Sequence, residues 1–155
     1  MKEISVTEAF GSAPPRSPAV LCLKGTDGSS DLILTEWFTW LNIRRQPMIS
    51  FSMSRNAGMG LNLSTGDPLI LAFPPTEDAL QYKQGVRTAA DGRVKELPRW
   101  IHPVREEGLE AEIPEESGIV LQCTLAGAYN YPFKKVRIFN CNLEKAMERI
   151  TEAET

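Results

Sequence analysis

The alternation of residues between Pro47 and Ser54 constrains the fold of this chain most strongly. Ile49, Phe51 and Met53 occupy every second position, and serine follows each of them. Because successive side chains of a strand point to opposite faces, this period of two predicts a strand with one apolar face and one hydroxyl-bearing face. Serine side chains are small, so the second face leaves room for something to lie against it.

Other apolar runs predict further strands. They span residues 19–23, 31–40, 69–73, 118–126 and 136–141. Asp27-Gly28 lies between the first two runs and favours a tight turn, so these runs are expected to pair as a hairpin. Five or six strands with few helices predict a mainly β fold, a small barrel or sandwich, in a single domain covering residues 1–155.

Two short helices are expected at the periphery of this fold. Thr76 can cap a helix that ends near Gly85. Asn142 can cap a closing helix, because Leu143 and Met147 lie on one helical face together with Ile150. Residues 143–155 are therefore predicted to form a C-terminal helix and tail.

The remaining segments carry weaker patterns. Residues 1–18 end in a proline-rich stretch and are expected to form an extended lead-in. Residues 55–63 contain a glycine turn and a weakly helical stretch, and residues 86–116 are polar with scattered prolines. The latter segment is expected to form loops and short extended pieces.

Composition excludes several classes of function. The net charge is −3, from 17 basic and 20 acidic residues, which gives no electrostatic case for binding nucleic acid. No apolar run approaches the roughly 18 residues of a membrane span. One histidine and three scattered cysteines, at positions 22, 123 and 141, do not make a metal site. An odd number of cysteines without a signal sequence indicates reduced thiols in the cytoplasm.

Most motifs for catalysis are absent from the sequence. A serine or cysteine nucleophile usually needs a histidine base, and His102 lies in a polar, proline-flanked stretch where a surface role is the simpler interpretation. Gly58-Met59-Gly60 lacks the third glycine and the βαβ context of a dinucleotide site. No catalytic residue and no metal ligand is predicted.

Two segments remain as candidate binding sites. After the serine-rich strand, Arg55 offers a planar cation for an anion, and Ser52, Ser54 and Asn56 add donors. The alternative is an ordinary turn with a surface arginine. Trp37-Phe38-Thr39-Trp40 can line a pocket for a planar ligand or can simply pack in the core.

The order of these motifs resembles the flavin reductase-like family of FMN-binding split barrels. The resemblance runs from about Ser17 to Pro74 and resumes at residues 113–123. It rests on a strand, a glycine turn, Trp37-Phe38-Thr39, Gln46-Pro47 leading into the serine-rich strand, and Thr65-Gly66-Asp67. It implies a six-stranded antiparallel split barrel of the Greek-key type, a homodimer with FMN near the interface, and an oxidoreductase that takes electrons from NAD(P)H or a protein donor.

The resemblance also implies which residues bind FMN. The segment before the tryptophan would contact the isoalloxazine, and the turn after the serine-rich strand would hold the phosphate. The implied cofactor-binding residues are Ile33, Leu34, Thr35, Glu36, Trp37, Ser52, Ser54, Arg55, Asn56 and Asn62. Trp37 or Trp40, with Tyr129 or Tyr131 of a partner subunit, would shape the pocket over the ring.

A second function stays open beside the reductase. Leu34 and Glu36 stand where the family often has Thr and Ser, and residues 126–131 replace the Gly-Asp-His stretch that is linked to nicotinamide use. These differences favour the alternative of a non-catalytic flavin-binding electron carrier, or of a split barrel with a repurposed pocket.

Overall fold

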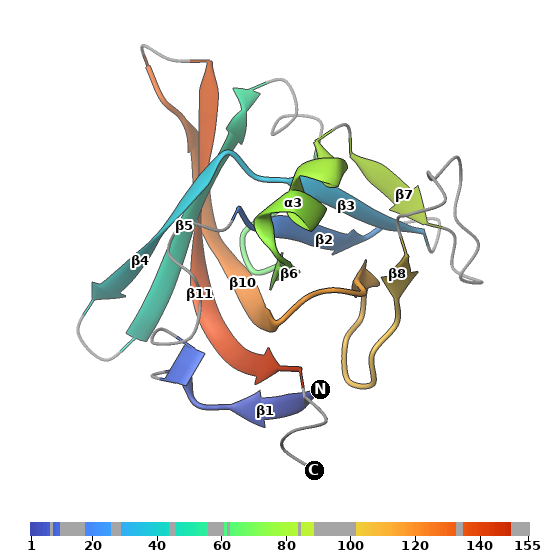
Figure 1. The fold of residues 1–155 in the computed structure, drawn as a ribbon. Coiled ribbons are helices and arrows are strands. Elements are labelled where there is room, and N and C mark those ends of the chain that lie inside the picture. Colours follow the sequence, from blue (N-terminus) through green and yellow to red (C-terminus); the bar gives the residue numbers. More distant parts are fainter. Residues whose placement is uncertain are drawn as a thin grey trace.

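One large antiparallel sheet makes up most of the protein (Figure 1). The computed structural model describes residues 1–6, 8–9, 18–25, 29–43, 46–55, 61, 63–83, 85–88, 102–132 and 135–149. Within these residues the sheet has nine strands, in the order β4-β5-β11-β10-β6-β2-β3-β7, with β1 added along β11. The mainly β, antiparallel prediction is confirmed, although six strands were expected.

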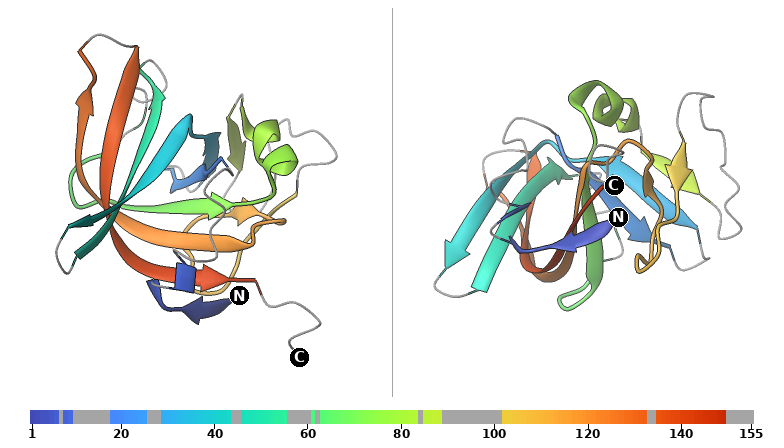
Figure 2. Two further views of the ribbon diagram at one scale, coloured as in Figure 1. Left: turned by 60° about the vertical axis from the view of Figure 1, so that its left-hand side comes forward. Right: turned by 60° about the horizontal axis from the view of Figure 1, so that its bottom comes forward.

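The strands lie as follows. They are β1 (Lys2–Ile4), β2 (Val20–Lys24), β3 (Ser30–Leu34), β4 (Trp37–Ile43), β5 (Gln46–Ser54), β6 (Pro68–Phe73), β7 (Val86–Thr88), β10 (Ile119–Asn130) and β11 (Val136–Glu148). A separate two-stranded sheet joins β8 (Pro103–Val104) to β9 (Ile113–Pro114), and α3 (Thr76–Ala79) continues into the 3₁₀ turn η1 (Leu80–Tyr82). Figure 2 shows β10 and β11 curving through the length of the molecule.

The sheet carries a buried core on each side. The barrel interior contains the predicted apolar face of β5, and the Phe51 ring stacks on Phe139 with centroids 5.1 Å apart. The second core lies between the outer side of β2 and β6 and the segment 109–113, with Tyr82 of η1 also buried there. Burial on both sides explains why β6 carries a continuous apolar run from Leu69 to Phe73.

Two irregularities bend the pair β10–β11. The register shifts between Gln122 and Cys123 and again between Leu125 and Gly127. Such bulges add a residue to one strand and increase its local twist. They allow β10 and β11 to belong both to the barrel and to the part of the sheet that extends beyond it.

The predicted C-terminal helix is wrong over residues 143–148, which continue β11. Both faces of this strand segment are buried, because Leu143 and Ala146 enter the barrel core while Met147 packs in the second core. Apolar residues on both faces, with a bulge between them, reproduce the spacing of an amphipathic helix. Residues 150–155 lie outside the described part.

Other local predictions are corrected or confirmed as follows. The strand expected over residues 31–40 is interrupted at Thr35 and Glu36, and its halves pair with different neighbours. Pro75, not Thr76, is the N-cap of α3. The start of the lead-in, β1, is paired with β11. The hairpin of β2 and β3 is confirmed, and its Asp27-Gly28 turn lies outside the described residues.

Candidate functional site

A row of four cross-strand neighbours brings two of the predicted site residues together on the outer face of the sheet. Trp37 of β4 pairs with Ser52 of β5, Ser52 with Ile138 of β11, and Ile138 with Tyr129 of β10. Directly opposite residues of antiparallel strands point to the same side. We call Trp37, Ser52, Ile138 and Tyr129 the aromatic row.

The aromatic row has exposed ends and a buried middle. The exposed fraction is 42% for Trp37 and 48% for Tyr129, against 0% for Ser52 and 8% for Ile138. At about 4.8 Å between strands, the two aromatic Cα atoms lie roughly 14 Å apart. The row therefore has a floor of two small or branched side chains, which is covered in this structure, between two aromatic side chains that reach solvent.

The hydroxyl of Ser52 is the unusual group in this row. Its Oγ is buried and has no hydrogen-bond partner in the described part of the chain. Ser50, two residues earlier on the same face, donates to Asn140 Oδ1 at 2.5 Å. Since buried polar groups are nearly always hydrogen-bonded, the free hydroxyl of Ser52 marks a place where a ligand can donate or accept.

The segment 33–37 is positioned by a joint at Thr35. Both the N–H and the Oγ1 of Thr35 donate to the carbonyl of Ala19, each at 2.9 Å, and the residue is buried. One residue later, Glu36 N–H donates to Ser52 O at 2.8 Å. The chain thus stops pairing with β2 and begins to pair with β5 within two residues. This places the predicted ring-binding segment beside the serine-rich strand β5.

The side chains of this segment point in different directions. Ile33 packs against the barrel core and Leu34 against the second core, on opposite sides of β3. Glu36 and Trp37 are exposed. Trp40 packs inward, edge-on to Phe38 at 6.0 Å, so Trp37 rather than Trp40 faces outward.

Arg55 ties the end of β5 to the hairpin of β10 and β11. Its N–H donates to Lys135 O at 2.8 Å, and its Nη2 donates to Tyr131 O at 2.9 Å. Ser54, half-buried, precedes it on the outer face and pairs with Val136. Asn56 and Asn62, the remaining predicted contacts, lie outside the described residues.

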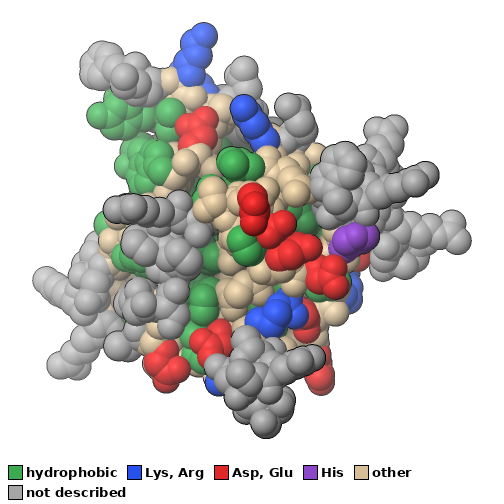
Figure 3. All heavy atoms as spheres, viewed as in Figure 1, with side chains coloured by type: hydrophobic (Ala, Val, Ile, Leu, Met, Phe, Trp, Pro, Cys, Tyr) green, Lys and Arg blue, Asp and Glu red, His purple; other side chains and the backbone are tan. Residues whose placement is uncertain are grey.

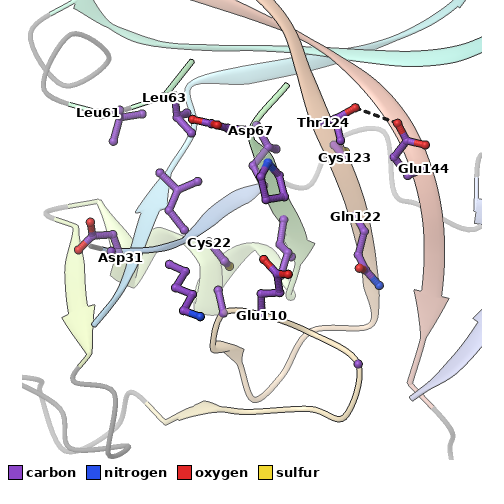
Figure 4. Close-up of a pocket in the computed structure, with 18 of the residues that line it drawn as sticks. Cys22, Asp31, Leu61, Leu63, Asp67, Glu110, Gln122, Cys123, Thr124 and Glu144 are labelled. Carbon is purple, nitrogen blue, oxygen red and sulfur yellow. Dashed lines mark hydrogen bonds between the residues drawn. The ribbon is translucent and has the colours of Figure 1, made fainter. Parts of the chain in front are cut away.

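A cavity of about 520 Å³ lies in a different part of the molecule (Figure 4). It opens where β2 ends and β6 begins, beside the middle of β10, and the segment 108–111 forms part of its wall. None of the predicted site residues that the structure describes lines it. Four carboxylates and two basic side chains surround it: Asp31, Asp67, Glu110, Glu144, Lys24 and Arg87.

The described residues offer little acid–base or nucleophilic chemistry. Burial raises the pKa of the Cys22 and Cys123 thiols far above the ordinary value and raises that of Cys141 to about 12, so all three stay protonated at neutral pH. No group of three or more His, Cys, Asp or Glu side chains among these residues can hold a metal ion. No helix in the described part is both long and apolar enough to cross a membrane.

The charged surface shows no dominant sign on the face seen in Figure 3. Basic side chains are scattered among acidic ones and form no continuous patch there. His102 is exposed and lies next to β8. Its backbone carbonyl accepts from Glu115 N–H at 3.0 Å.

Sequence reasoning missed two features of these sites. Tyr129 completes the aromatic row from within the same chain, whereas it was expected to come from a partner subunit. The cavity has no motif, because its wall is formed by a loop that is far from the floor strands in sequence. The exposed aromatics of β10 were the available signal for the first feature.

The fold is similar to that of solved flavin reductases and of a nitroreductase. The 2-nitrobenzoate 2-nitroreductase NbaA of Pseudomonas fluorescens matches with a TM-score of 0.63 and 10% identity, over 94% of this chain and 73% of that one. A protein of Shewanella frigidimarina, described as a flavin reductase with a split barrel domain, matches with a TM-score of 0.62 and 11% identity, over 94% of this chain and 75% of that one.

A third similar structure was solved with ligands. It is the NADH:FAD oxidoreductase SgcE6 of Streptomyces globisporus in complex with NAD and FAD fragments, with a TM-score of 0.63 and 13% identity, over 92% of this chain and 81% of that one. No family model matches the sequence, and no curated protein matches it either. At this level of identity the similarity is one of fold. The chain has the split-barrel fold of the flavin reductase-like proteins.

Proposed function

We propose that the protein binds FMN on the aromatic row and acts as an oxidoreductase of the flavin reductase-like class. The observation that carries the proposal is the buried, unpartnered Ser52 hydroxyl between two exposed aromatic side chains, on a fold that resembles flavin-dependent enzymes. Such a setting suits a large planar molecule with polar groups along one edge.

The residues present fit the flavin ring well. Ile138 supplies an apolar surface, Trp37 and Tyr129 supply aromatic walls, and Ser52 Oγ supplies one hydrogen bond. A ring that covers this floor would remove the exposed aromatic surface from water, which is favourable at roughly 25 cal/mol per Å².

The site fits the phosphate of FMN less well than the ring, because one residue favours the phosphate and another opposes it. Arg55 can pair with phosphate oxygens through a guanidinium that the Tyr131 carbonyl already orients. Glu36 is exposed, and its backbone is bonded to Ser52, so its carboxylate opposes a phosphate in this region. The ring is therefore expected to contribute more of the binding free energy than the phosphate.

Bound FMN would supply the redox chemistry by accepting a hydride and passing electrons to an acceptor. The chain itself would bind and orient the ring through Trp37, Ser52 and Tyr129, and would limit its contact with water. A homodimer is part of the proposal, because a second copy could cover the open side of the row. The buried, unpaired thiols suit a reducing compartment such as the cytoplasm.

Titration of the purified protein with FMN, followed by flavin fluorescence, tests the binding site. Replacing Ser52 with Ala should weaken FMN and riboflavin alike, by about tenfold, since one hydrogen bond is lost from the ring. Ser50→Ala is the matched control, because the Ser50 hydroxyl already has a partner. If Ser52→Ala binds both flavins like the unchanged protein, the ring does not lie on this row.

The phosphate is tested separately from the ring. Arg55→Ala should weaken FMN by about ten- to a hundredfold and leave riboflavin unchanged, because a charged hydrogen bond contributes about 1.5–3 kcal/mol. Arg105→Ala, at an exposed arginine on the cavity loop, serves as the control. An equal loss for both flavins would place the phosphate elsewhere.

Anaerobic mixing of the FMN-loaded protein with NADH or NADPH distinguishes the reductase from the electron carrier. Bleaching of the flavin within seconds supports a reductase that uses a nicotinamide donor. Bleaching by dithionite but by neither nucleotide supports the alternative of a carrier with a protein donor, which the exposed Glu36 and the half-buried Leu34 favour.

A further inference from the structure

The cavity beside β10 is separate from the aromatic row. Thr124 of β10 lines the cavity and Tyr129 belongs to the row, so the two places lie about 17 Å apart along one strand at 3.4 Å per residue. Its volume of about 520 Å³ falls within the range of small-molecule pockets, about 300–1,000 Å³. What can bind there follows from its floor, its wall and its rim.

The floor of the cavity is apolar and rigid. Residues of three hydrogen-bonded strands line it. Cys22 of β2 and Ile70 of β6 belong to the second core, and Leu69 of β6 and Cys123 of β10 belong to the barrel core on the other side of the sheet. The exposed fraction of each is 5% or less. A ligand that fills the cavity therefore needs an apolar body.

The wall of the cavity is held in place by several contacts. Arg105 Nη1 donates to Glu110 O at 3.2 Å, and Glu112 N–H donates to Ser30 Oγ at 3.2 Å. Leu109 and Ala111 are buried in the second core. The segment between them is therefore anchored on both sides, and the cavity is preformed, which lowers the entropic cost of binding.

The rim of the cavity carries oriented carboxylates. Glu144 Oε1 accepts from Thr124 Oγ1 at 2.8 Å, as the dashed line in Figure 4 shows, and Asp67 Oδ2 accepts from Ser64 N–H at 2.8 Å. Figure 4 also shows Glu110 reaching in from the wall segment, on the side opposite Asp67. The two hydrogen bonds fix the orientation of the Glu144 and Asp67 carboxylates at the rim.

The basic groups of the rim do not balance this charge. Arg87 is paired with Asp31 at 3.1 Å. Among the lining residues that the structure describes, the three other carboxylates face one ammonium group, that of Lys24. A cleft lined mainly by one sign of charge concentrates the opposite sign at its mouth.

We propose that this cavity binds a small amphipathic cation, an organic amine whose apolar body lies on the floor of β2, β6 and β10 and whose ammonium group lies between Glu110 and Glu144. The proposal does not depend on flavin binding, because no residue of the aromatic row takes part. It assigns a second binding site at the opposite end of strands that both sites share.

Calorimetric titration of the full-length protein with three probes of one shape tests the charge requirement. The probes are 2-phenylethylamine, 2-phenylethanol and phenylacetate, which carry a positive, no and a negative charge. The amine should bind at least about tenfold more tightly than phenylacetate, with the alcohol between them. Equal binding of the three probes, or no binding of the amine up to its solubility, would overturn the proposal.

Three charge variants test the location. Glu110→Gln and Glu144→Gln should each weaken the amine about three- to tenfold, while Lys24→Gln should strengthen it by about threefold, because each removes one charge from a partly screened rim. Glu115→Gln is the matched control, since Glu115 is exposed and does not line the cavity. Affinities that change as much in Glu115→Gln as in Glu110→Gln would contradict the site.

Discussion

The aromatic row and the cavity are two recesses made by different means. The row lies on four adjacent strands, so its geometry is set by the register of the sheet. The cavity has a sheet for its floor and a loop for its wall, and this wall depends on a few hydrogen bonds and two buried side chains. The row should therefore withstand changes that disturb the cavity, whereas a change within the barrel core should damage both.

Replacing Phe51 with Ala should have the largest effect. Phe51 lies directly before Ser52 on β5, is fully buried and stacks on Phe139. Loss of a buried phenylalanine typically costs about 3–5 kcal/mol of unfolding free energy. Urea unfolding measures the loss, with Ser50→Ala as a comparison on the other face of the same strand. A loss below about 1 kcal/mol would mean that the core beneath the row is loosely packed.

Ionisation of a single buried thiol at high pH should have the next largest effect. Burial raises the pKa of Cys22 and Cys123 beneath the cavity, and that of Cys141 to about 12, whereas an unfolded thiol titrates near pH 8.5. The folded state therefore keeps protons that the unfolded state loses, and stability falls as pH rises above about 8.5. The expected loss is about 2 kcal/mol per thiol by pH 10.

Urea unfolding between pH 7 and pH 10 measures this loss. Cys22→Ala removes one of the three contributions, so its stability should fall less steeply with pH than that of the unchanged protein. Identical slopes for the two proteins would show that the Cys22 thiol ionises as easily in the folded state as in the unfolded one.

Thr35→Val should have an intermediate effect on the joint between the two regions. The substitution keeps the shape of the side chain and removes the hydrogen bond from Oγ1 to Ala19 O. A buried hydrogen bond of this kind contributes about 0.5–1.5 kcal/mol, with a further cost if Ala19 O is left underbonded. Because Thr35 positions Glu36 and Trp37, FMN affinity should also fall, while 2-phenylethylamine affinity should not. Loss of amine binding alone would contradict this role.

Arg149→Gln should have the smallest effect and should be confined to the cavity. Arg149 Nη1 binds Glu106 Oε1 at 3.1 Å, and Nε donates to Ser117 O at 3.0 Å, so this side chain fastens the base of the wall segment. It is about one-third exposed, and such ion pairs contribute at most about 1 kcal/mol. Because the wall segment would be held less firmly, amine affinity should fall two- to threefold. FMN affinity should be unchanged. A larger effect on FMN would contradict the separation of the two sites.

The contrast between the regions also explains what the sequence could predict. The alternation around Phe51 and Ser52 predicted β5 and its hydroxyl face, because a strand with one buried face has a period of two. The same rule failed for residues 143–148, where both faces are buried and a bulge intervenes. The resemblance assigned Trp37 and Ser52 to one cofactor site, and the pairing of β4 with β5 makes them cross-strand neighbours. Their role in binding FMN stays a prediction.

The cavity could not be predicted because its parts meet only through long-range packing. Glu110 and Glu144 belong to segments that were interpreted as a solvated loop and a helix, and neither carries a motif. Only the antiparallel pairing of β10 with β6 and β11 brings these residues to one rim. The positions of charged residues in a sequence do not indicate which of them will line the same cavity.

The bulge between Leu125 and Gly127 has a consequence for how this surface can change. Up to Leu125, odd-numbered residues of β10 face the barrel interior, but beyond the bulge Ala128 faces inward and Tyr129 outward. If the same sequence paired with β11 without this bulge, Tyr129 would take an odd-numbered position that faces the barrel interior. The bulge therefore keeps on the surface an aromatic side chain that a regular pairing of the same residues would turn into the core, and the strand pairing on either side of it is unaltered.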